Sequence, residues 1–179
     1  MPNSLNGWPV LPEYPVTSFV APGGKHVYVT NRAVAVIFEH IARWWHANLT
    51  PIAVSHPENR VRPRERKGTT PDGKWDAVGI HSWRPNNTIS TGWSNHTSAT
   101  AMDINGHLHP YEPTWRKAYP GQPYRDGFTS SQRSALRAKA AELGVIRLGI
   151  DFPIGSRDGM HVEIAPGKDY QLVLAAARQ

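Results

Sequence analysis

The 179-residue sequence contains no cysteine. A chain without cysteine has no disulfide, no thiolate zinc finger, no iron–sulfur cluster and no cysteine nucleophile, so any metal must be bound by His, Asp or Glu. A chain of this length removes roughly 70% of its extended surface from water on folding, so its core needs neither disulfide nor metal. We therefore expect a single domain over residues 1–179, with a proline-rich, loop-rich segment over 1–30.

The sequence also lacks long apolar runs and a recognisable export signal. No stretch approaches the roughly 18 consecutive apolar residues of a membrane span, and residues 1–10 lack the charged and apolar regions of a secretion signal. We expect a soluble protein that does not insert into membranes. We expect it to be made in the host cytoplasm without a signal peptide and to act on an extracellular target only after release.

Acidic residues are in the minority. Lys and Arg number 20 against 14 Asp and Glu, which gives a net charge of +6 and a pI near 9.8. This balance favours an anionic partner such as nucleic acid, an acidic membrane or a cell-wall polymer. Residues 60–67 hold five of the cationic side chains and form either a solvated loop or a docking strip for an anionic polymer.

Periodicity and capping residues predict an α+β fold. Apolar residues at helical spacing predict a helix that Asn31 caps. Thr129 and Gln132 form the capping box of a second helix, which Gly144 ends, and Asp169 can cap a third. Alternating or short apolar runs predict strands at Val16–Val20, His26–Thr30, Pro51–Ser55, Val78–Arg84, Ala101–Asn105, Val145–Phe152 and Met160–Ile164.

Two of these strands place ionisable side chains on a polar face. Because side chains alternate along a strand, Asp103 points away from its apolar neighbours, and so do His161 and Glu163. If the two strands are neighbours in one sheet, Asp103 and His161 point into a common site that His96 reaches from the preceding loop. Two His and a carboxylate are the ligand set of a catalytic zinc site, which keeps its fourth position for water.

Each spacing is weak evidence by itself in a chain with nine histidines. A single His is more often a surface or hydrogen-bonded residue than a ligand, and Asp158-Gly159 is also a hairpin-turn dipeptide. We interpret His107 and His109 as rim or surface residues rather than ligands. They belong to a region rich in proline and aromatic residues, 106–127, that we expect to be an ordered loop.

Two longer strings carry a family resemblance. SNHTSATAMD, residues 94–103, and DGMHVE, residues 158–163, resemble the S-x-H-x-x-G-x-A-x-D and D-x-x-H-x-E signatures of the LAS-type zinc peptidases. This family comprises D-Ala-D-Ala carboxypeptidases and L-Ala-D-Glu endopeptidases, including phage endolysin domains. The segment ending at Arg84 lies where the family has a strand-end arginine. Ala99 replaces the usual Gly, which is harmless at negative φ and costly at positive φ.

The resemblance implies a DD-peptidase or hedgehog-like fold, in which a small antiparallel sheet carries the zinc site on one face and packs against two or three helices. Glu163 has an alternative role as the base, and Ser94 could merely begin a turn. The roles that the resemblance implies are His96, Asp103 and His161 as ligands of Zn²⁺, Asp158 as general base, Arg84 as the group that binds the oxyanion or a substrate carboxylate, and Ser94, Glu163 and Trp83 as substrate-binding or supporting residues.

The implied function is zinc-dependent hydrolysis of a peptide bond in bacterial peptidoglycan, by an endopeptidase or D,D-carboxypeptidase of the phage endolysin type. We expect a monomer whose partner is peptidoglycan and not nucleic acid. One alternative is a non-catalytic, zinc-containing wall-binding module of the same fold. Another is a nucleic-acid binder, prompted by residues 60–67 and seven Trp, although no helix-turn-helix, RNP-like or zinc-finger spacing supports it.

Overall fold

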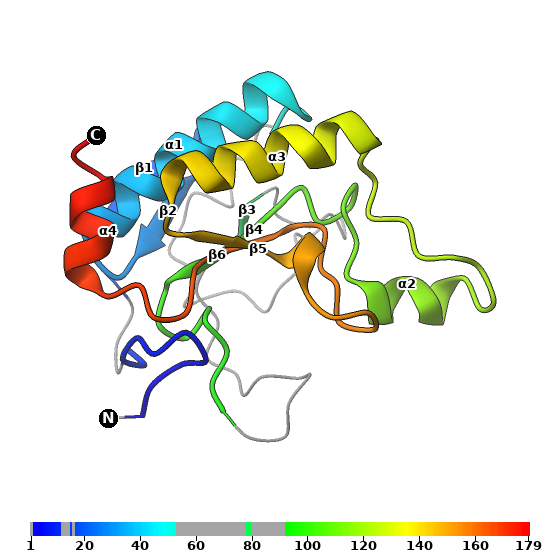
Figure 1. The fold of residues 1–179 in the computed structure, drawn as a ribbon, viewed down its shortest axis with the longest axis horizontal. Helices are drawn as coiled ribbons and strands as arrows, with labels where there is room; N and C mark the ends of the chain where they lie inside the picture. Colours follow the sequence, from blue (N-terminus) through cyan, green and yellow to red (C-terminus); the bar gives the residue numbers. More distant parts are fainter. Residues whose placement is uncertain (1, 12–14, 16, 53–77, 80–91) are drawn as a thin grey trace.

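The computed structural model describes residues 2–11, 15, 17–52, 78–79 and 92–179. Within this part of the chain the fold is α+β, with small antiparallel sheets and four α-helices (Figure 1). The elements in chain order are β1 (Thr17–Val20), β2 (His26–Val29), α1 (Arg32–Asn48), β3 (Val78–Gly79), β4 (Ala101–Ile104), α2 (Glu112–Ala118), α3 (Ser130–Leu143), β5 (Ile146–Leu148), the 3-10 turn η3 (Gly149–Asp151), β6 (His161–Ile164) and α4 (Tyr170–Ala176).

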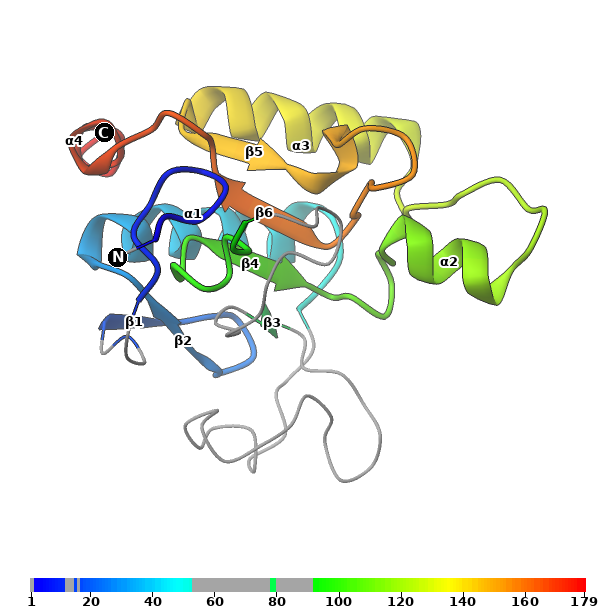
Figure 2. The same ribbon diagram turned by 90° about the horizontal axis from the view of Figure 1, so that it is seen from below.

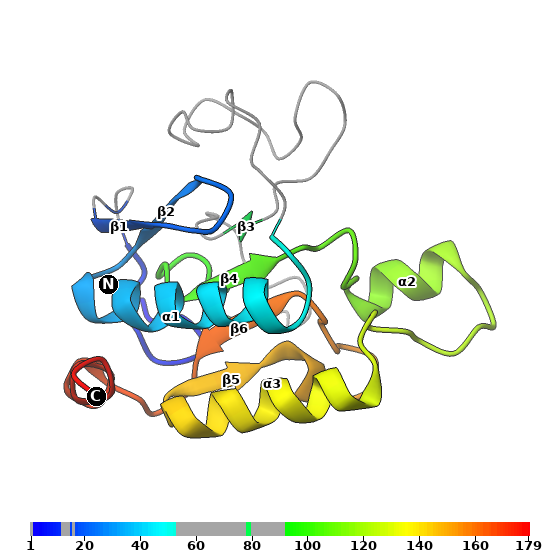
Figure 3. The same ribbon diagram turned by 90° about the horizontal axis from the view of Figure 1, so that it is seen from above.

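The larger sheet has the strand order β3-β4-β6-β5, with each neighbouring pair antiparallel. Helices α1 and α3 lie side by side over one face of this sheet, as the two views in Figure 2 and Figure 3 show. The smaller sheet is the β1–β2 hairpin, which packs against α1. The opposite face of the larger sheet is therefore left for polar side chains and for the N-terminal segment.

The sheet face toward the helices is apolar and closely packed. Burial of one large aliphatic side chain stabilises a fold by about 1.5–3 kcal/mol, so this layer fixes which way each strand faces. The side chains that β4, β6 and α1 bury almost completely in it are Met102, Ile104, Val162, Ile164, Val34, Ile37, Phe38, Ile41 and Trp45.

The helix ends confirm the capping predictions. Asn31 accepts a hydrogen bond from the backbone of Val34 at 3.1 Å, and Thr129 forms the predicted capping box with Gln132. Gly144 ends α3 at a φ of 68°, in the left-handed region. Among the described residues, no helix has the length and apolar character needed to cross a membrane.

Two predicted elements differ in the structure. Residues 106–127 are not a loop throughout, because α2 forms within them; Pro113 lies in its first turn, where a helix needs no backbone N–H donor. The strand predicted over Val145–Phe152 ends at Leu148, where the 3-10 turn begins. Parts of the strands predicted over Pro51–Ser55 and Val78–Arg84 lie outside the described residues, as do residues 60–67. The single domain over 1–179 stays a prediction.

Helix α2 is attached to the body through a buried carboxylate. The Glu112 side chain has no exposed surface and accepts hydrogen bonds from Arg157 at 2.8 Å, Arg116 at 2.9 Å and the Gly155 backbone N–H at 2.9 Å. The hydrogen bond from Arg157 is the main reason that the pKa of Glu112 falls to about 2, and Arg116 adds to it. This carboxylate ties α2 to the 155–157 loop that precedes Asp158.

Glu112→Gln should lower the free energy of unfolding by about 2 kcal/mol at neutral pH, because it removes charge-assisted hydrogen bonds from a buried group. The pKa of Glu112 is depressed on folding from 4.5 to about 2. The wild-type advantage is therefore present above about pH 4.5 and is lost as the pH falls toward 2. Urea denaturation at pH 7 and pH 3 measures both effects.

The matched control is Glu39→Gln, which breaks the exposed ion pair between Glu39 and Arg43 on α1. An exposed pair of this kind contributes less than about 1 kcal/mol, so this variant should stay close to the wild type at both pH values. Equal stability losses in the two variants would contradict the role assigned to Glu112.

Candidate metal centre

The pairing of β4 with β6 places two of the predicted ligands together. Asp103 and His161 are directly opposite each other in the antiparallel register. The Oδ1 atom of Asp103 lies 3.0 Å from Nδ1 of His161 and 3.4 Å from Nε2 of His96. The ligand atoms of these three residues all lie within 4.8 Å of one another. The structure thus brings His96, Asp103 and His161 into one cluster on the sheet face opposite the helices.

His96 is held by a tight turn before β4. Ser94 Oγ accepts a hydrogen bond from the backbone N–H of His96 at 3.3 Å, so in the structure Ser94 shapes the turn. Ala99 closes the turn by donating its N–H to the carbonyl of His96 at 3.1 Å. The φ of Ala99 is 52°, which is the costly case for an alanine in place of glycine.

The spacing of the three side chains fits a metal ion. Two ligand atoms about 2.1 Å from a tetrahedral ion lie about 3.4 Å apart, close to the separations from Asp103 Oδ1 to the two imidazoles. Two nitrogens and one carboxylate oxygen form a donor set that suits zinc, and three protein ligands leave one position open. His96, Asp103 and His161 could therefore hold a metal ion.

Glu163 supports His161 from the side opposite Asp103. Its Oε2 atom lies 2.9 Å from Nε2 of His161, and its Oε1 atom lies 2.8 Å from Nε of Arg147. A carboxylate on one ring nitrogen fixes the tautomer and orientation of the imidazole and leaves the other nitrogen to bind a metal. Glu163 is thus placed to support a ligand.

Asp103 lies so close to His96 and His161 that their charges shift its pKa, and it shifts the pKa of His161 in turn. Burial alone would raise the pKa of Asp103, but His96 and His161 together hold it well below its usual range. Burial alone would lower the pKa of His161, but the hydrogen bonds that its ring donates to the carboxylates of Asp103 and Glu163 raise it to about 10. The Asp103 carboxylate is therefore ionised at neutral pH, as a metal ligand must be.

Asp158 lies in the turn that leads into β6. Its backbone carbonyl accepts a hydrogen bond from the His161 N–H at 3.3 Å. Its carboxyl Oδ1 atom is buried and has no hydrogen-bond partner among the described residues. Burial, and then the charge of Asp103, raise the pKa of Asp158 to about 7. A buried carboxyl oxygen without a partner is uncommon in a protein and calls for a functional explanation.

Gly149 permits the close approach of the η3 turn to Asp158 and to the start of β6, a role that the sequence analysis did not predict. A Cβ atom at Gly149 would lie 2.3 Å from the Asp158 carbonyl oxygen, 2.8 Å from the His161 Cβ and 3.0 Å from the Asp158 Cβ. The Cβ atoms of Asp158 and His161 therefore both lie directly beside Gly149. The signal in the sequence is one Gly between a strand and a turn, which many loops share.

Other predicted residues have different outcomes. Arg84 and Trp83 lie outside the described residues, so their predicted roles stay predictions. His109 is not a rim or surface residue: it is fully buried, stacks on Phe128 with ring centroids 3.8 Å apart and contacts the Asp126 carbonyl at 3.0 Å. Burial lowers the pKa of His109, and the prediction failed because an apolar stacking partner far along the sequence covers the ring.

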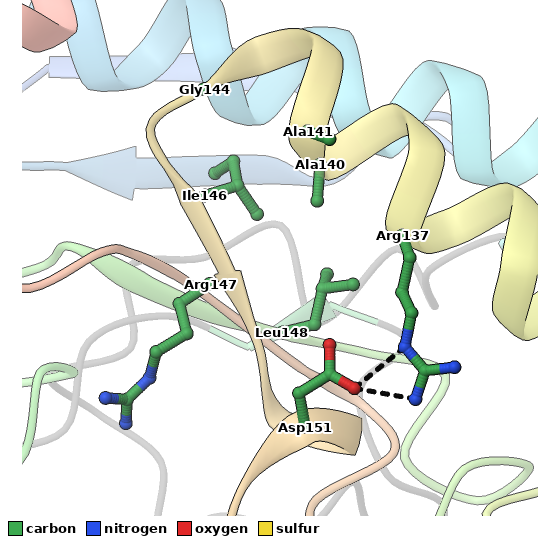
Figure 4. Close-up of a pocket in the computed structure, with 8 residues that line it drawn as sticks. All are labelled: Arg137, Ala140, Ala141, Gly144, Ile146, Arg147, Leu148 and Asp151. Carbon is green, nitrogen blue, oxygen red and sulfur yellow. Dashed lines mark hydrogen bonds and ion pairs between the residues drawn. The ribbon is translucent and has the colours of Figure 1, made fainter.

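An open groove lies between α3 and β5, on the helix side of the sheet (Figure 4). Arg137 donates two hydrogen bonds across it to Asp151, at 2.7 and 2.8 Å, and Arg147 points away from this pair. None of the three candidate metal ligands lines the groove. Because the charge of Arg137 is already paired, the groove does not compete with the metal cluster as a candidate site.

Comparisons of the chain with protein-family models, with curated proteins and with solved structures found no match in any of the three. The functional assignment therefore depends on the residues of the site.

Gly149→Ala should destabilise the protein by about 1–3 kcal/mol, because the added methyl group meets backbone that cannot move independently. Chemical denaturation measures the loss. Gly106→Ala is the matched control, since its Cβ would press only against the flexible Met160 sulfur at 2.6 Å and should cost less. Wild-type stability in Gly149→Ala would contradict the close packing of this turn.

Ala99→Val should destabilise the protein by about 2–3 kcal/mol, because a β-branched residue at positive φ is strained and the position is fully buried. Ala99→Gly should stay within about 1 kcal/mol of the wild type, since the relief of strain offsets the loss of one buried methyl group. Thermal denaturation of the two variants tests the pair. Equal stability of the valine and glycine variants would contradict a strained backbone at this turn.

Proposed function

We propose that the protein is a zinc-dependent peptidase that cleaves a peptide bond of bacterial peptidoglycan, with a DD-peptidase-like form of the α+β fold. The observation that carries the proposal is the buried, unpartnered Oδ1 atom of Asp158 beside the cluster of His96, Asp103 and His161. A site that only held a structural ion would need no such carboxyl group, because closed structural sites complete their coordination with protein ligands. The sequence resemblance to LAS-type peptidases assigns the same residues.

In this proposal His96 Nε2, Asp103 Oδ1 and His161 Nδ1 hold the metal. When bound, zinc polarises a substrate carbonyl and lowers the pKa of water to about 7. Asp158 Oδ1 accepts a proton from the attacking water and later donates it to the nitrogen of the leaving amine. Burial raises the pKa of Asp158 to about 7, and a nearby cation lowers it, so this carboxyl group is suited to be ionised for the first step and protonated for the second.

The remaining roles follow the sequence resemblance. Arg84 binds the carbonyl oxygen as it becomes an oxyanion, or anchors a substrate carboxylate, because its planar guanidinium suits both. Trp83 is a substrate-binding or supporting residue. The net charge of +6 favours approach to the anionic bacterial wall, as expected for an enzyme of the phage endolysin type.

Asp158→Asn should lower kcat on purified peptidoglycan by about 10²- to 10⁴-fold, because the amide cannot accept the proton, while zinc affinity changes little. Zinc-loaded protein is incubated with the polymer, and new peptide termini are identified by mass spectrometry. The termini also show whether the bond is L-Ala-D-Glu, D-Ala-D-Ala or a cross-link to a diamino acid. A chelator should abolish cleavage by the wild type, and zinc should restore it.

The matched control is Asp169→Asn. Asp169 caps α4 and is not part of the cluster. Asn caps a helix as well as Asp does, so this variant should keep wild-type activity. Full activity in Asp158→Asn would contradict the role of this carboxyl group. A zinc-loaded wild type that binds the wall and releases no peptide would contradict a peptidase and favour the non-catalytic wall-binding module.

A further inference from the structure

The N-terminal segment 3–11 lies on the sheet face that carries the metal cluster (Figure 2). It is hydrogen-bonded along the loop that holds His96. The Leu5 N–H donates to the Trp93 carbonyl at 3.1 Å, and the Leu11 N–H donates to the Thr97 carbonyl at 3.1 Å. Beside Leu5, the Oγ atoms of Ser4 and Ser98 lie 2.9 Å apart, within hydrogen-bond distance. The loop is thus held at both ends by residues about 90 positions earlier in the chain.

Asn6 anchors this segment to the sheet. Its side chain is buried and donates from Nδ2 to Thr100 Oγ1 at 2.8 Å and to the Ile164 carbonyl at 3.0 Å. Its Oδ1 atom accepts a hydrogen bond from Ser4 Oγ at 2.8 Å. A buried amide with these partners costs little to bury, whereas loss of any partner leaves an unpaired polar group. The segment is therefore bound in one position.

Asn95 connects the segment to the metal cluster. Its Oδ1 atom accepts the backbone N–H of Asn6 at 2.9 Å, and its Nδ2 atom donates to Glu163 Oε2 at 2.5 Å. The same Glu163 oxygen lies 2.9 Å from Nε2 of His161. The two ends of the Asn95 amide cannot be exchanged, because the exchange would put an amide donor against the Asn6 N–H and an oxygen against a carboxylate.

We infer that the N-terminal segment 3–11 is a positioning element of the metal centre, which it fixes by holding the His96 loop directly and His161 through Asn95 and Glu163. This inference rests on the proposed zinc site. Glu163 keeps the imidazole of His161 turned with Nδ1 toward Asp103 while its own carboxylate is held. Arg147 holds one oxygen of that carboxylate, and Asn95 holds the oxygen that contacts His161. Groups that orient a ligand in this way typically change metal affinity by 10- to 100-fold.

Asn95→Asp tests the inference in the full chain. The variant keeps the shape of the side chain and the acceptor for the Asn6 N–H, but it replaces the donor to Glu163 with a carboxylate. The zinc Kd, measured by competition with a chelating indicator, should rise by about 10-fold or more. The imidazole ¹⁵N shifts of His161 in the zinc-loaded protein should also change, because its Nε2 partner is no longer fixed.

Asn6→Ala is a second variant that leaves the Asn95 side chain intact. It should raise the zinc Kd and speed amide hydrogen exchange over residues 93–99, because the segment is released from Thr100 and Ile164. The control is Thr129→Ala, which removes the capping box of α3 and costs about 1 kcal/mol of stability without contacting this network. Its zinc Kd should equal that of the wild type.

Wild-type zinc affinity in both Asn95→Asp and Asn6→Ala would overturn this inference and leave the proposed peptidase intact. A zinc Kd that rises as much in Thr129→Ala as in Asn95→Asp would overturn it as well, since the effect would then be general destabilisation. A wild-type protein that binds no zinc would overturn both proposals.

Discussion

The antiparallel register of β4 against β6 is the constraint on which the site depends. Asp103 faces His161 across this pair, and the alternate residues of both strands are buried under α1 and α3. A slip of one residue would turn the apolar side chains to the polar face and the ligand side chains into the core. The free energy gained by burying these apolar side chains fixes the register and so keeps the metal cluster in place. No member of the cluster belongs to the apolar layer.

Charges gathered on one sheet face need partners, because an isolated buried charge is very unfavourable. Asp103 lies between two imidazoles, and Glu163 has His161, Arg147 and Asn95. Asp158 differs, since one carboxyl oxygen is buried without a partner among the described residues. The turn that holds His96, on a different segment, contains Ala99 at positive φ. Strain and an unpaired group close to one cluster are typical of a site selected for function rather than for stability.

The parts of the fold that could be predicted are those that local sequence decides. Asn31 and the capping box at Thr129 act within one helical turn, so their effect is visible in the sequence. Helix α2 differs from the prediction of an ordered loop over 106–127, which depended on the many proline and aromatic residues of that region. Pro113 is compatible with a helix because it lies in the first turn. His109 was misplaced because the ring that covers it, Phe128, is 19 residues away and contacts it only in the folded chain.

The sequence by itself determined the α+β class, the helix caps and the alternation that puts Asp103 and His161 on polar faces, because these follow from helix and strand periodicity. Only the tertiary structure decided that these two residues are neighbours, that Asp158 lies beside them and that Asn6 and Asn95 reach the cluster. The physical reason is that hydrogen bonds between distant segments depend on how the apolar layer packs. Asn6 and Asn95 are 89 positions apart in the sequence, and no local pattern in the sequence predicts the hydrogen bond between them.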